Sequence, residues 1–102
     1  MPITPQAAGT IAWNCTETSS AKTVPATFQL VRVYNKGTNI VYVEIGTTAV
    51  LPANGAATGG MPIVAGDSVL IDKGNATSLA AICAAGETGT LLVTPCNGDA
   101  SV

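Results

Sequence analysis

The stretch VRVYNKGTNIVYVEIG, residues 31–46, has the clearest pattern in the chain. Its apolar side chains alternate with polar or aromatic ones on both sides of NKG, where Gly37 can adopt the positive φ of a tight turn. Two alternating runs joined by a short turn predict a β-hairpin. The face of this hairpin that is predicted to be core consists of Val31, Val33, Val41, Val43 and Ile45.

The opposite face of the predicted hairpin carries Arg32, Tyr34, Tyr42 and Glu44. The turn does not fix a single register, but one register brings the two opposite charges within cross-strand reach. Tyrosine and arginine are enriched at protein interfaces, so we expect this face to be a contact surface between proteins. A platform for a ligand is the alternative.

Further short strands are expected where apolar residues lie between Gly and Pro turns. Segment 76–86 contains helix-forming Ala and Leu, but we expect a strand because a helix would stand alone among strand patterns. The predicted fold is all-β, a single small sandwich or barrel of about six to eight short antiparallel strands. The expected strands outside the hairpin are GTIAW at 9–13, a short strand at 49–51, Ser68–Asp72, the segment 76–86 and ETGTLLVTP at 87–95.

Residues 1–26 differ from the rest of the chain because they combine three prolines with the polar cluster NCTETSSAKT. We expect them to form an extended N-terminal arm, and residues 27–102 to form the β domain. The arm could add a strand to the sheet of a neighbouring protein. Its candidate contact residues are Ile3, Ile11 and Trp13.

Charged residues make up only 10% of the 102 residues and the net charge is −2, whereas about 25% is typical of a soluble domain. The four cations are scattered, so binding to nucleic acid is not expected. The first ten residues lack the features of a secretory signal, and the longest apolar run, LAAICAA, is too short to cross a membrane. Aromatic residues are 4% of the chain, so the core should be thin, which favours a homo-oligomer.

The sequence contains no pattern typical of catalysis or metal binding. Histidine, the commonest general base, is absent, the serines lack a GxSxG context, and the carboxylates are dispersed. We therefore expect no enzymatic activity, no cofactor and no metal site. Cys15, Cys83 and Cys96 have no CxxC spacing and are expected to be free thiols, with a Cys83–Cys96 disulfide as the alternative.

Two segments resemble the small β-rich virion proteins of tailed bacteriophages. These are residues 31–50, VRVYNKGTNIVYVEIGTTAV, and residues 59–98, GGMPIVAGDSVLIDKGNATSLAAICAAGETGTLLVTPCNG. The shared motifs are V-R-V-x-N-x-G-x-N-x-V-[YF]-V-x-x-G, then P-I-x-A-G, and finally G-T-x-x-x-T-P. The resemblance covers residues 31–98 and leaves the first thirty residues unmatched.

The resemblance implies a structural virion protein without catalytic residues, of the capsid decoration or cement type. It implies a place on the capsid surface after synthesis in the host cytoplasm, with the major capsid protein or other virion proteins as partners. A trimer is the oligomer that it favours. The alternative is a carbohydrate- or receptor-binding module of a virion fibre or adhesin, which needs exposed aromatic side chains. The aromatic residues available for such a site are Trp13, Phe28, Tyr34 and Tyr42.

Overall fold

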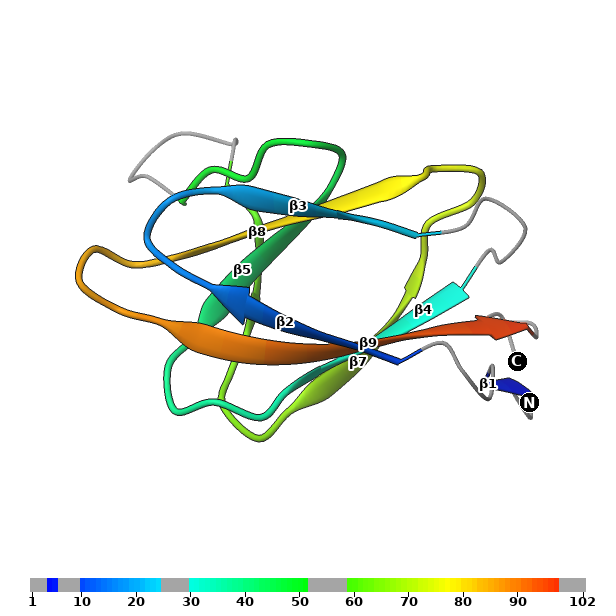
Figure 1. Ribbon diagram of the computed structural model, residues 1–102, viewed down its shortest axis with the longest axis horizontal. Helices are drawn as coiled ribbons and strands as arrows, with labels where there is room; N and C mark the ends of the chain where they lie inside the picture. Colours follow the sequence, from blue (N-terminus) through cyan, green and yellow to red (C-terminus); the bar gives the residue numbers. More distant parts are fainter. Residues whose placement is uncertain (1–3, 6–9, 25–29, 52–58, 98–102) are drawn as a thin grey trace.

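The computed structural model describes residues 4–5, 10–24, 30–51 and 59–97, which form β-strands and no helix (Figure 1). The prediction of an all-β fold is therefore confirmed. The described part of the chain accordingly has no helix long and apolar enough to span a membrane. The strands are β1 (Thr4–Pro5), β2 (Ile11–Cys15), β3 (Ser20–Thr23), β4 (Leu30–Asn35), β5 (Val41–Ile45), β6 (Met61–Ile63), β7 (Ser68–Asp72), β8 (Ser78–Cys83) and β9 (Gly89–Asn97).

The strands form two antiparallel sheets that lie in two layers (Figure 1). In sheet A, the short β1 and the longer β2 both pair with one side of β9, and β4 and then β7 follow on its other side. Sheet B has the order β3-β8-β5-β6. From β2 onward every connection except β5 to β6 passes from one sheet to the other. With β2 to β9 counted as eight strands, this is the strand order of a jelly roll.

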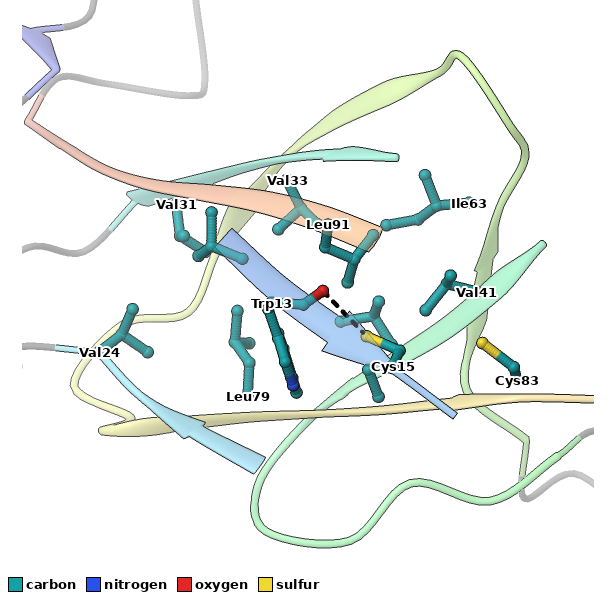
Figure 2. Close-up of a cluster of buried hydrophobic side chains, with 13 residues drawn as sticks. Trp13, Cys15, Val24, Val31, Val33, Val41, Ile63, Leu79, Cys83 and Leu91 are labelled. Atoms are coloured by element: carbon teal, nitrogen blue, oxygen red, sulfur yellow. Dashed lines mark hydrogen bonds between the residues drawn. The ribbon is translucent and has the colours of Figure 1, made fainter. Parts of the chain in front are cut away.

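One hydrophobic core lies between the two sheets (Figure 2). It is built by the alternation of strand side chains, because every second residue of each strand points to the opposite sheet. Valine is its commonest residue, and Trp13 is its largest side chain. The core residues are Trp13, Cys15, Val24, Val31, Val33, Val41, Val43, Ile63, Leu79, Ala81, Cys83, Leu91 and Val93.

The predicted core face is confirmed at four positions and wrong at Ile45. Val31, Val33, Val41 and Val43 are buried, whereas Ile45 is 51% exposed. Strand β6 pairs with β5 only as far as Val43, and no described strand covers β5 on that side at Ile45. The alternation is right, but the partner strand ends before the last apolar residue.

The predicted hairpin does not form. Strand β4 pairs with β7 and β9 in sheet A, whereas β5 pairs with β6 and β8 in sheet B. The side chain of Asn35 lies where the chain crosses, and it is fully buried. Its Nδ2 donates to the carbonyl oxygens of Asn39 and Ile63, both at 2.8 Å, and its Oδ1 accepts from the backbone N–H of Gly37 at 3.0 Å. These bonds hold the connection across the end of the sandwich, so β4 and β5 lie in different layers.

Gly37 does not have the positive φ that a hairpin turn would require. Its backbone instead lies close to β9, where a Cβ would be 3.1 Å from the backbone nitrogen of Thr90. The N–H of the neighbouring Lys36 donates to the carbonyl of Thr90 at 3.0 Å. Glycine is thus needed here for close approach to β9 and not for left-handed backbone.

The predicted N-terminal arm is not confirmed. Strand β2 pairs along its whole length with β9, and β3 pairs with β8, so residues 10–24 belong to the two sheets. Trp13 and Val24 are buried in the core. Residues 1–3, 6–9 and 25–29 of the predicted arm and its boundary lie outside the described residues. The polar composition of this segment misled the prediction, because both strands are at sheet edges, where one side chain in two faces solvent.

Other strand predictions have mixed outcomes. Strands β7, β8 and β9 are confirmed, including the strand in the Ala-rich segment 76–86. Strand β6 falls outside the expected strands, and the expected strand at 49–51 does not form. There the N–H of Ala49 donates to Ser19 Oγ and that of Val50 to Glu44 Oε1, both at 2.8 Å. Side chains therefore satisfy these backbone groups, and the segment joins no ladder.

Aspartate substitutions at two positions of β5 should separate the inner residue from the exposed one. We expect Val43→Asp to unfold the protein, because Val43 is 4% exposed and an unpaired buried carboxylate costs several kcal/mol against a total stability of about 5–15 kcal/mol. Ile45→Asp should remain folded and lose less than about 1 kcal/mol. Urea denaturation followed by circular dichroism measures both, and equal effects would contradict the placement of β5.

Substitution of Asn35 tests the crossing between the sheets. We expect Asn35→Ala to lower the free energy of unfolding by about 2–4 kcal/mol, because it leaves buried backbone groups without their hydrogen bonds. Asn39→Ala is the matched control, since the Asn39 side chain makes a surface bond to the carbonyl of Thr88 at 2.9 Å, and its loss should cost about 1 kcal/mol or less. Chemical denaturation of both variants makes the comparison.

Candidate interaction surface

The four residues predicted to share one face lie on opposite faces of the molecule. Arg32 and Tyr34 are on β4 and point away from the core on the outer face of sheet A. Tyr42 and Glu44 are on β5 and belong to the outer face of sheet B. The predicted common surface is therefore wrong, because β4 and β5 do not pair. No direct contact between Arg32 and Glu44 is compatible with this arrangement.

On the outer face of sheet A, polar and apolar side chains lie next to each other. Arg32 is exposed, and its Nη2 donates to Ser68 Oγ at 3.0 Å. In the register of the sheet, Arg32 stands opposite Leu70 of β7, and Tyr34 stands opposite Leu92 of β9. Tyr34 is 38% exposed and Leu70 39% exposed. We call Arg32, Tyr34, Leu70 and Leu92 the sheet-A face.

The outer face of sheet B is more covered at the predicted residues. Glu44 is half-buried, and its Oε1 accepts the bond from Val50 described above. Gly60 lies close to it, since a Cβ on Gly60 would be 3.1 Å from Glu44 Cγ. Tyr42 is also half-buried and stands between Pro62 of β6 and Ile82 of β8. Glu44 thus holds a connecting segment over the sheet and has a structural role.

The N-terminal candidates are placed differently from the prediction. Trp13 is 2% exposed, and its indole Nε1 donates to Ser20 Oγ at 3.1 Å, which ties β2 to β3 across the two sheets. Trp13 is therefore a core residue and cannot serve as a surface contact. Ile11 is half-buried and pairs with Val93 of β9. Ile3 lies outside the described residues.

The thiol groups are enclosed in the fold. Cys15, Cys83 and Cys96 are free and buried, so the alternative of a Cys83–Cys96 disulfide is not found. Burial raises the pKa of Cys15 to about 12, with a smaller contribution from Cys83 nearby. Burial also raises the pKa of Cys83, and the negative charge of Glu87 adds to this. Since the thiolate is the reactive form, these two side chains are poor nucleophiles near neutral pH.

Sequence reasoning missed two buried polar side chains. Asn35 falls in the predicted NKG turn, and Lys73 is one of the four scattered cations. Lys73 is buried after β7, and its Nζ donates to the carbonyl of Ala76 at 2.9 Å. Burial lowers the pKa of the Lys73 ammonium group. The sequence carries no signal for either burial, because asparagine is common in exposed turns and lysine is almost always exposed.

Clustered metal ligands are not present in the described part of the chain, where no three His, Cys, Asp or Glu side chains could hold a metal ion together. Comparisons with protein-family models, curated proteins and solved structures gave no match. The candidate functional feature among the described residues is therefore the exposed outer surface formed by strand faces and strand edges. Its residues suit contact with another protein, because tyrosine, arginine and leucine combine apolar area with hydrogen-bonding groups.

Thiol labelling should report the enclosure of the cysteines. At pH 8 we expect Cys15 and Cys83 to react with a soluble thiol reagent at least a hundredfold more slowly in the folded protein than in urea, because burial hides the sulfur atoms and keeps them protonated. Mass spectrometry after digestion identifies the labelled residue. Comparable rates in both states would contradict the buried positions.

Proposed function

We propose that this protein is a non-enzymatic structural protein of a bacteriophage virion, most closely of the capsid decoration or cement type. In this role it binds the outer shell and stabilises the junctions between capsomers. Its partners are the major capsid protein or other virion proteins, and its place is the capsid surface. The sequence resemblance at residues 31–98 is the source of the virion assignment.

The observation that carries this proposal is that the reactive side chains are buried, whereas one outer sheet face exposes residues that suit contact with a protein. Polar and reactive groups such as Asn35, Cys15 and Cys83 are inside the fold, whereas the outer face of sheet A presents tyrosine, arginine and leucine. A surface with few charges and exposed apolar side chains suits burial against another protein. The jelly-roll strand order adds support, since capsid domains use this architecture, although a fold does not by itself define a function.

The sheet-A face is the surface that we propose for the contact with the shell. Tyr34 supplies a large side chain whose hydroxyl can bond at the rim of an interface, and Arg32 is already oriented by its bond to Ser68. A cement protein acts by covering exposed area on two neighbouring subunits at once. A rigid sheet suits this task because its outer side chains are held at fixed spacings by the ladder.

Self-association is part of the same proposal. The core contains one tryptophan and otherwise aliphatic and small residues, so the apolar area buried within one chain is modest. A homo-oligomer would bury more of the exposed apolar side chains. The trimer is favoured by the resemblance alone, and no contact among the described residues selects a three-fold arrangement.

A carbohydrate- or receptor-binding module remains the second candidate. Jelly rolls also include lectin domains, and a sugar site needs an exposed aromatic platform. Tyr34 is the most exposed aromatic residue among those described, whereas Trp13 is buried and Tyr42 is half-buried. Only the sheet-A face could therefore supply such a platform within the described residues. A glycan array with the purified protein separates this candidate from the first.

Matched tyrosine variants test the proposed contact. We expect Tyr34→Ala to weaken binding to capsids that lack the protein by tenfold or more, because truncation of an interface aromatic commonly costs about 2 kcal/mol. Tyr42→Ala on the opposite face should bind as the parent does. Cosedimentation with the capsids measures both affinities. The reverse pattern would place the contact on sheet B.

Electron microscopy of the virion with the protein present and removed tests the role itself. We expect added density on the outer shell between capsomers when the protein is present, and earlier rupture of the shell on heating when it is absent. Density confined to the tail or fibres, or no density at all, would contradict the decoration role.

A further inference from the structure

The two sheets have four outer edges among the described residues, formed by β7 and by β1 with β2 in sheet A and by β3 and β6 in sheet B, and these edges differ in how they are protected. An unpaired strand edge can add a foreign strand, and proteins usually prevent this with lysine, proline or a bulge. In sheet B, β3 carries the exposed Lys22 and β6 carries Pro62. In sheet A, β7 has neither lysine nor proline within its five residues, and its central residue Leu70 is 39% exposed.

The backbone of β7 presents its free hydrogen-bonding groups at alternate residues. The N–H of Asn35 donates to the carbonyl of Asp67 at 2.9 Å, so this carbonyl faces β4, whereas the N–H of Asp67 donates to the carbonyl of Val64 at 3.1 Å. Because this orientation alternates along an antiparallel strand, Val69 and Ile71 also face β4. The N–H and C=O groups of Ser68, Leu70 and Asp72 therefore point away from the sheet. No described strand pairs with this side of β7.

The side chains along this edge are complementary to those of a second copy. In an antiparallel pair centred on Leu70, each Leu70 stands opposite the other, and Ser68 stands opposite Asp72. Arg32 donates to Ser68 Oγ at 3.0 Å, which puts its positive charge at the position that the second copy's Asp72 would face. All of these side chains lie on the same outer face, because directly opposed residues of an antiparallel pair share a face.

We propose that two copies of this chain associate through β7, antiparallel and centred on Leu70, so that sheet A continues from one copy into the other. The two-fold pairing exchanges about six backbone hydrogen bonds at three opposed residue pairs. It buries the exposed Leu70 against its own symmetry mate. It also pairs Arg32 with the second copy's Asp72 at both ends, as a self-complementary two-fold interface requires.

The pairing does not depend on what the protein binds. It joins the two sheet-A faces into one continuous surface, which doubles the area available to any partner. It is also a different state from the trimer favoured by the sequence resemblance. The two states are distinguishable by mass, since one chain is 10.1 kDa.

Sedimentation equilibrium of the full chain over a wide concentration range tests the state directly. We expect a concentration-dependent dimer for the parent protein. Leu70→Lys should weaken the dimer tenfold or more, because it places two like charges opposite each other at the centre of the interface. Ala12→Lys is the matched control, since Ala12 is an exposed residue of β2, the other outer strand of sheet A, and it should leave the dimer unchanged.

Charge reversal tests the register. Arg32→Asp and Asp72→Arg should each weaken the dimer tenfold or more, and the double variant should restore it, because the opposite charges then face each other again. Circular dichroism and melting temperatures check that the variants are folded. Failure of the double variant to recover the dimer overturns the register that we propose.

Hydrogen exchange measured by NMR gives a readout without any substitution. The outward amides of Ser68, Leu70 and Asp72 should become protected as the concentration rises through the dimerisation range. The amide of Ala12 should not. A protein that stays monomeric at millimolar concentration, a trimer, or protection confined to Ala12 each overturns the proposal.

Discussion

The hydrogen bonds of the Asn35 side chain are the constraint on which the arrangement of the chain depends. They join the end of β4 in sheet A to the carbonyl of Ile63 in sheet B. A buried amide that satisfies three backbone groups is expensive to disrupt, because each orphaned group would lose its partner away from water. The chain is thereby held in a crossing between layers. The pairing partners of β4 and β5, and the separation of Tyr34 from Tyr42, follow from this crossing.

The crossing also explains why the N-terminal segment is part of the fold. Each sheet receives strands from distant parts of the chain, so β9 needs a second neighbour beside β4, and β2 supplies it. Trp13 then fills the space between the layers and bonds to Ser20 of β3. A core of valine, leucine and alanine would otherwise lack a large side chain, and the burial of a tryptophan contributes more apolar area than any of them.

The function that we propose rests on the side chains and strand edges that this architecture leaves exposed. The jelly-roll connections put turns at the ends of the sandwich and leave sheet faces and strand edges along its sides. Lysine and proline protect the edges of sheet B, whereas sheet A exposes leucine and tyrosine next to β7. Contacts with other proteins are thus expected at sheet A, where apolar area and unpaired backbone groups coincide.

The sequence by itself determined the fold class and most, but not all, of the local strands. Alternation with a period of two identified the buried face of Val31, Val33, Val41 and Val43, and the Gly turns delimited β7, β8 and β9. Which strands pair, and in which sheet, was decided only by the tertiary structure. The bond from Asn35 to Ile63 spans 28 residues, and the burial of Trp13 depends on β9 near the other end of the chain. Local periodicity reports which way a side chain points, but not which distant strand covers it.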